Sequence, residues 1–136
     1  MTGERLTRSP FSGFVGAHLE ESGEGYVRVS LAVGPEHTNP YGVMHGGVVT
    51  TLMDTSMGVL ISVMRGDEVK DRPHATVEMN ASFLGTARPG DEIVSEARIV
   101  RLGKRFAVGE TEARRRSDGE LVALGRFTFV IRDRRE

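Results

Sequence analysis

Hydrophobic and polar positions alternate in two stretches of the chain, as they do in a strand that buries one face. Residues 26–33 carry aliphatic side chains at every second position, with mostly polar ones between them: Val27, Val29, Leu31 and Val33 against Tyr26, Arg28 and Ser30. Residues 75–83 repeat the pattern, with one side formed by Ala75, Val77, Met79, Ala81 and Phe83. Both stretches are predicted to be half-buried strands.

Turn motifs place three more strands after these. The turn Arg88-Pro89-Gly90-Asp91 leads into a strand predicted over residues 92–101, adjacent to the strand over residues 75–83. The Asp-Gly pair at residues 118–119 predicts a hairpin between strands over residues 104–114 and 121–132. Because strands joined by hairpins run in opposite directions, we expect a mainly antiparallel sheet.

The pattern predicts one long helix, from Gly46 or Gly47 to Met64, after a loop over residues 34–42 that is rich in Pro, Asn and Gly. Its aliphatic half lies opposite Asp54 and is expected to pack on the sheet: Val48, Val49, Leu52, Val59, Leu60 and Val63. A short helical turn is also predicted over residues 11–17. The 136 residues are the usual size of one domain. The expected fold class is therefore α+β, a single domain over residues 1–136 whose sheet wraps the helix.

Asp54 is the only charged residue between His45 and Arg65. Its neighbours at helical spacing are small or polar: Gly47, Thr50, Thr51 and Gly58. The carboxylate is either the polar edge of an amphipathic helix or a functional group in a shallow groove. Apolar surroundings resist ionisation, which would make Asp54 a better base at neutral pH.

The residues His45-Gly46-Gly47 stand at the predicted start of the helix. They form either a tight turn or a site for a carbonyl group, because the first amides of a helix lack acceptors and carry the positive end of its dipole. His45 either adds a donor there or serves only as a cap. Asn39 has the same two interpretations, since Asn-Pro is also a turn signal.

Composition and charge exclude several classes of function. The formal net charge is −1, which gives no overall positive field for a nucleic acid or a membrane surface, and the basic runs over residues 114–116 and 132–135 are expected to be solvated edges. Cysteine is absent, and the four histidines show no metal-ligand spacing: His18, His37, His45 and His74. We therefore predict no metal and no cofactor.

The start of the chain and its apolar runs bear on location. Residues 1–10 lack the apolar core of a signal peptide, and no apolar run looks long enough to span a bilayer. We expect a soluble protein of the cytoplasm.

The run Asn-Pro-Tyr-Gly-Val-Met-His-Gly-Gly over residues 39–47, with Asp54 nine residues after its histidine, resembles the hotdog-fold acyl-CoA thioesterases of the PaaI-like (phenylacetate-pathway) type. The similarity continues through residues 76–80, 89–91, 102–105 and 119–126. It implies a curved antiparallel sheet around the long helix and hydrolysis of acyl-CoA to free acid and CoA. It also implies a homodimer or a dimer of dimers, with active sites shared across the dimer interface.

The resemblance assigns roles residue by residue. It implies that the Gly46 N–H binds the thioester oxygen, with Asn39 and His45 at the same end of the site, and that Asp54 acts from the partner subunit as general base or nucleophile. The hydroxyl of Thr76 would orient the water or the aspartate. A further group, expected near the CoA phosphates or else a solvated hairpin end, comprises Gly103, Lys104 and Arg105.

Two other functions remain open on this fold. A dehydratase or hydratase would need an acid–base pair beside the carbonyl, and the motifs of those families are not found. A non-catalytic acyl-CoA-binding protein would be marked by a lost carboxylate, whereas Asp54 is present. The acyl group itself, whether aryl-acetyl or a medium or long chain, is left undetermined by these residues.

Overall fold

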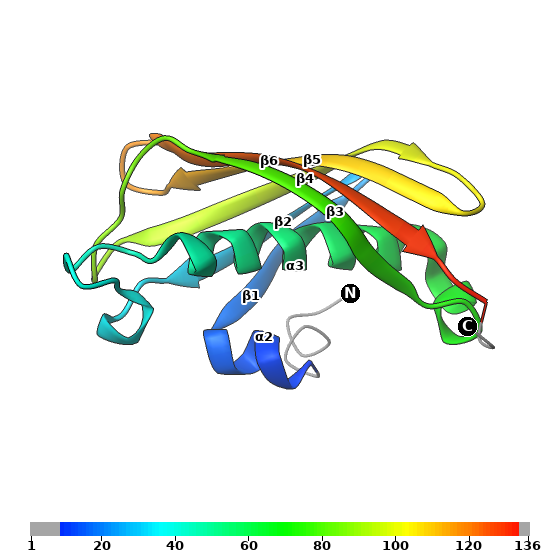
Figure 1. Cartoon of the computed structure of the whole chain (residues 1–136), viewed down its shortest axis with the longest axis horizontal. Coiled ribbons are helices and arrows are strands. Elements are labelled where there is room, and N and C mark those ends of the chain that lie inside the picture. The colour runs from blue at the N-terminus through cyan, green and yellow to red at the C-terminus, as the bar shows by residue number, and fades with distance from the viewer. Residues whose placement is uncertain (1–8, 134–136) are drawn as a thin grey trace.

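A curved sheet of six antiparallel strands wraps around one long helix, α3 (Gly46–Arg65) (Figure 1). The structure is a computed structural model and describes residues 9–133. Residues 1–8 and 134–136 lie outside the described residues. They include most of the segment predicted to lack a signal peptide and the end of the C-terminal basic run. The predicted α+β arrangement, with the sheet around one apolar helix, is confirmed.

The strands follow the order β1-β2-β4-β5-β6-β3 across the sheet, and every neighbouring pair is antiparallel. Their bounds are Ala17–Gly23 (β1), Tyr26–Ala32 (β2), His74–Phe83 (β3), Glu92–Leu102 (β4), Phe106–Arg115 (β5) and Leu121–Ile131 (β6). A short helix, α2 (Pro10–Val15), precedes β1, and two 3-10 turns flank α3: η1 (Pro35–His37) and η2 (Gly66–Lys70). The two edges of the sheet are therefore β1 and β3.

The predicted adjacency of β3 and β4 is wrong. β3 pairs with β6 at one edge, while β4 lies between β2 and β5. The connection over residues 84–91 is longer than the two to five or so residues of a usual hairpin loop, and it crosses the end of the sheet. Within it, the amides of Leu84 and Gly85 donate to the Val122 carbonyl of β6.

The N-terminal part differs from the prediction in having a strand. The helical turn expected over residues 11–17 is α2, which ends at Gly16 in the left-handed conformation (φ 93°, ψ 29°). The chain then enters β1, which was not predicted. Only Ala17 of this strand is fully buried, so its sequence lacks the alternation that marks the other strands.

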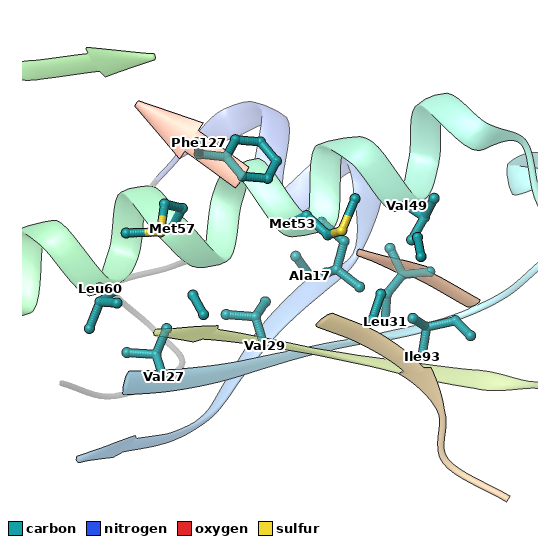
Figure 2. Close-up of a cluster of buried hydrophobic side chains, with 14 of the residues drawn as sticks. Ala17, Val27, Val29, Leu31, Val49, Met53, Met57, Leu60, Ile93 and Phe127 are labelled. Carbon is teal, nitrogen blue, oxygen red and sulfur yellow. The ribbon is translucent and has the colours of Figure 1, made fainter. Parts of the chain in front are cut away.

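The core lies between α3 and the concave side of the sheet (Figure 2). Of the predicted helix face, Val49, Leu52 and Leu60 are buried, and the three other valines are partly buried. Met53 and Met57 are fully buried in place of those valines. The buried face is thus turned toward the methionines, which fill irregular space beneath a curved sheet.

The helix α3 is apolar enough, together with η2, to cross a membrane by length and composition alone. The expectation that no apolar run has this length is therefore wrong. The apolar side chains of α3 instead pack against the strands, and a carboxylate lies in the middle of the helix. The apolar character of α3 is that of a core helix.

Candidate active site

Asp54 lies in the middle of α3 and is half-buried. Thr76 donates a hydrogen bond from Oγ1 to Asp54 Oδ1 over 2.6 Å. Burial raises the pKa of Asp54 above its ordinary value, and the hydrogen bond from Thr76 offsets part of the rise. No charged group within residues 9–133 contributes to this shift. Asp54 is therefore a carboxylate of increased basicity, oriented by one hydroxyl.

A bulge in β3 brings Thr76 to the helix side of the sheet. Thr76 pairs with Phe129 and Met79 pairs with Phe127, and both phenylalanines are buried in the core. Directly opposed residues point to the same side, so Thr76 and Met79 share the concave side although an odd number of positions separates them. The register shift just after Thr76 allows this.

The alternation predicted for residues 75–83 is wrong at this bulge. Ala75 pairs with Val130 on the outer side, and Val77 is 50% exposed. Met79 and Phe83 remain 44% and 56% exposed, because β3 is an edge strand. The edge of the sheet nearest Asp54 is consequently an exposed apolar surface.

Two hydrogen-bond donors stand at the start of α3. His45 is the N-cap residue, and its Nδ1 accepts from the Gly47 amide over 2.8 Å. A neutral imidazole that accepts at Nδ1 carries its proton on Nε2. Within residues 9–133, neither that Nε2–H nor the Gly46 N–H has an acceptor. The pair is suited to polarise a carbonyl oxygen.

Asn39 shapes the loop that leads to these donors. Its Oδ1 accepts from the amides of Tyr41 (2.9 Å) and Val43 (3.4 Å), as expected for an Asn-Pro turn. The His37 carbonyl accepts from the His45 amide (2.8 Å), which fixes the entry to α3. Asn39 is thus placed as a turn residue near the donors.

The structure separates the site residues into two groups. Thr76 is bonded to Asp54, whereas His45 and Gly46 lie at the helix start. Asp54 follows Gly46 by eight positions on one helix, which is about 12 Å along the axis. Within one chain, the carboxylate and the two donors are therefore about two helical turns apart.

A cationic pocket of about 470 Å³ lies at the other end of α3. Gly103 and Lys104 line it, and they belong to the turn before β5 rather than to a strand start as predicted. Arg105 is not among the lining residues, although its carbonyl accepts from the Ile131 amide over 2.7 Å. The pocket includes three arginines that the sequence did not single out: Arg65, Arg72 and Arg101.

These arginines have different roles in the pocket. The side chain of Arg65 is 2% exposed and donates to His74 Nδ1 (2.9 Å) and to the Arg72 carbonyl. Arg72 pairs with Glu68 (3.2 Å) and donates to the Lys104 carbonyl (3.2 Å). Among residues 9–133, Arg101 and Lys104 form no ion pair. Arg65 and Arg72 therefore build the wall, and two unpaired cations face the space.

His74 links the cationic pocket to the strand that carries Thr76. It accepts from Arg65 at Nδ1, and its Nε2 donates to the Gly58 carbonyl of α3 over 3.1 Å. Burial lowers the pKa of His74, the bond to Gly58 opposes this, and the charge of Arg65 lowers it further. A neutral His74 thus anchors the start of β3, two residues before Thr76.

In the described part of the chain, no three His, Cys, Asp or Glu side chains are grouped to hold a metal ion.

Comparison with known proteins gives consistent matches. The family profile of the thioesterase superfamily matches residues 41–122. Acyl-coenzyme A thioesterase 13 from Homo sapiens is 33% identical over 111 residues, which cover 81% of this chain and 76% of that protein. The solved structure of conserved protein PA5202 from Pseudomonas aeruginosa has a TM-score of 0.82 at 33% identity, covering 90% of this chain and 94% of that one. A mutant of the phenylacetic acid degradation protein PaaI from Thermus thermophilus has a TM-score of 0.78 at 25% identity, covering 90% and 98%.

The curved sheet around a central helix, with a carboxylate in that helix and free donors at its start, defines a hotdog-fold enzyme. The chain belongs to the thioesterase superfamily, and it is PaaI-like within it, as the sequence motif predicted.

Proposed function

We propose that the chain hydrolyses acyl-CoA thioesters, with Asp54 acting on the thioester carbonyl that Gly46 and His45 polarise. The observation that carries the proposal is the half-buried Asp54, which accepts from Thr76 and has no cationic partner among the described residues. The name of the human relative, acyl-coenzyme A thioesterase, supports the substrate class. We place the enzyme in the cytoplasm as a soluble protein.

The proposed site is built from two chains, because about 12 Å of helix separates Asp54 from Gly46. In a two-fold dimer, a contact between Gly46 and the partner's Asp54 is repeated with the roles reversed. The two α3 helices then run antiparallel and cross near Thr50. The exposed apolar edge strand β3 lies beside this face and supplies a surface for the second copy.

In the proposed dimer, the cationic pocket of the partner chain is available to the CoA part of the substrate. The end of the partner's helix, at Arg65, lies about 16 Å beyond its Asp54 along the axis, on the far side of the thioester. The phosphates of CoA would meet Arg101 and Lys104 there, which are the unpaired cations of the pocket. Gly103 and Lys104 retain the role that the resemblance implies, and Arg101 joins them.

In the proposed reaction the carbonyl oxygen accepts from the Gly46 N–H and the His45 Nε2–H, which stabilises the charge of the tetrahedral intermediate. Asp54 removes a proton from water as the water attacks, or attacks the carbonyl itself and is released by water in a second step. Collapse of the intermediate breaks the carbon–sulfur bond. The thiolate of CoA takes up one proton, and the products are the free acid and CoA.

The test is a thiol-release assay over a panel of acyl-CoA substrates, with Asp54→Asn as the isosteric variant. We expect kcat to fall by about 10²–10⁴-fold, the usual contribution of a general base. Glu110→Gln is the matched control, since Glu110 is an exposed carboxylate on the sheet. A wild type that cleaves no member of the panel would exclude the activity, and full activity of Asp54→Asn would exclude this role of Asp54.

A further inference from the structure

A cleft of about 400 Å³ is lined by residues of α2 and of the first turns of α3. The helix α2 lies on the side of α3 that faces away from most of the sheet (Figure 1). Its walls are mainly apolar and come from Phe11, Phe14 and Val15 of α2 and Val48 of α3. The volume falls within the usual range for small-molecule sites, about 300–1,000 Å³. The hydrolysis proposed for Asp54 and Gly46 does not itself use this cleft.

The aromatic wall of the cleft is exposed but held in place. Phe11 is 59% exposed and Phe14 is 86% exposed. The helix that carries them is tied down by His37, whose Nε2 donates to the Val15 carbonyl over 2.8 Å and whose Nδ1 accepts from the Gly34 amide over 2.9 Å. Two large apolar side chains on an anchored helix are a preformed surface that an apolar ligand would cover.

The cleft reaches the residues at the start of α3. His45 and Gly47, which flank Gly46, line it, and Thr51 lies one helical turn after Gly47. The Thr51 hydroxyl donates to the Gly47 carbonyl over 2.8 Å, so its polar group is already satisfied. A thioester carbonyl at Gly46 has two substituents, and the cationic pocket suits the one that bears the phosphates. The apolar cleft suits the other substituent.

We propose that the cleft between α2 and α3 binds the acyl group and selects uncharged, apolar acyl chains. This assignment rests on the proposed function, because it takes the carbonyl at Gly46 as its starting point. Glu36 lines the cleft with a side chain 70% exposed, and it adds negative charge to an otherwise apolar lining. Acyl groups that end in a carboxylate are therefore disfavoured by charge as well as by the apolar walls.

The first experiment compares S-decyl-CoA, a non-hydrolysable thioether, with CoA by titration calorimetry on the full chain. Wild type is expected to bind S-decyl-CoA more tightly than CoA. Phe11→Ala and Phe14→Ala should each weaken the binding of S-decyl-CoA by about tenfold and leave the affinity for CoA unchanged, since burial of one phenylalanine corresponds to a factor of that size. Both side chains are exposed, so the variants should fold. Leu124→Ala, an exposed apolar residue on the sheet, is the matched control.

The second experiment reverses the charge at Glu36. Wild type should cleave hexanoyl-CoA in strong preference to adipyl-CoA, which adds a terminal carboxylate. Glu36→Lys is expected to narrow this preference in kcat/KM by about tenfold or more, with Glu36→Gln between the two. Acetyl-CoA, whose acyl group carries no terminal charge, is the control substrate, and its kcat/KM should be the same in all three proteins.

Several outcomes would overturn the assignment. Equal affinity of wild type for S-decyl-CoA and CoA would do so even if the protein hydrolyses nothing, so this failure is separate from that of the proposed function. If Glu36→Lys keeps the wild-type preference for hexanoyl-CoA over adipyl-CoA, Glu36 does not select against acyl groups that end in a carboxylate. A change of molecular mass by light scattering in Phe14→Ala, with S-decyl-CoA affinity unchanged, would mean that a second copy covers the cleft.

Discussion

A half-buried carboxylate without a cationic partner is kept in its charged form at a cost to folding, and Asp54 is such a group. Burial raises its pKa, which makes it a stronger base, while Thr76 stabilises the charged form through one hydrogen bond. The two influences act in opposite directions on the same oxygen atoms. Thr76 thereby sets the pH range in which Asp54 is ionised and available.

Thr76→Val should move the acidic limb of the pH profile of kcat/KM to higher pH, because the variant loses the bond that lowers the pKa of Asp54. At a pH on that limb, the rate should fall by about tenfold, the scale of a hydrogen bond to a charged group. Thr76→Ser keeps the hydroxyl and should keep the wild-type profile. A uniform loss of rate in Thr76→Val, with the limb unmoved, would make Thr76 merely structural.

Asp54→Asn should stabilise the fold at pH 8 while it inactivates the enzyme. A raised pKa means that the folded state binds more protons than the unfolded state between the two pKa values, so stability falls as pH rises through that window. Asparagine does not ionise, so the variant avoids this loss. Its free energy of unfolding should be higher by on the order of 1 kcal/mol, the cost of a half-buried polar group. Denaturant midpoints at fixed protein concentration measure it, and the gain should vanish below the unfolded pKa.

Asp118→Asn is the control of opposite sign. The hydrogen bond from Arg115 lowers the pKa of Asp118, so its ionised form is the more stable one in the folded state. Its substitution should lower the free energy of unfolding at pH 8 and lose this effect as the pH falls through the folded pKa. Equal responses of the two variants to pH would contradict the assignment of burial as the cause at Asp54.

At the scale of elements, the site depends on how closely α3 approaches the sheet. Gly109 of β5 lies under the helix, and a Cβ built there would overlap Met57 and lie 2.8 Å from the Arg98 carbonyl oxygen. Met57 is fully buried and cannot move into solvent. The glycine therefore lets α3 lie at the depth that brings Asp54 to Thr76.

Gly109→Ala should lower the free energy of unfolding by about 1–3 kcal/mol, the cost of overpacking a core. Glu110→Ala, at the next position on the exposed side, should stay within about 0.5 kcal/mol of wild type. Urea denaturation of the three proteins compares them directly. An unchanged free energy of unfolding in Gly109→Ala would mean that the helix and the sheet move apart at little cost to make room for the added methyl group.

The sequence predicted α3 and five of the six strands, because burial on one face leaves a periodic pattern and turn motifs separate the strands. It missed β1, since a strand with one fully buried residue has no such pattern. It also misplaced β3, because pairing with β6 depends on the path of the connection and not on the strand itself. The motif around Gly46 and Asp54 indicated the candidate site, but the bulge that turns Thr76 inward leaves no periodic pattern in the sequence. Arg65, Arg72 and Arg101 come together only in three dimensions.

At the scale of the whole molecule, the proposed dimer contains two sites. Each site is formed by Gly46 and His45 of one chain and Asp54 of the other. If Asp54 serves the carbonyl held by the partner chain, substitutions of His45 in one chain and of Asp54 in the other fall in the same site of a mixed dimer, and the second site keeps both residues. His45→Ala removes a donor, and Asp54→Ala removes the carboxylate. A dimer with one chain of each kind then has one site with both losses and one site with none.

Mixing inactive His45→Ala and Asp54→Ala proteins in equal amounts should therefore restore activity to about a quarter of the wild-type level after full exchange, since half of the dimers are mixed and each has one intact site. The recovered kcat/KM per intact site should equal that of wild type. Exchange is followed with differently tagged chains, because recovery has meaning only when mixed dimers form. A mixture with confirmed exchange and no recovery would place Asp54 and His45 in one chain's site, and the 12 Å of helix between Asp54 and Gly46 would then have to be spanned in another way.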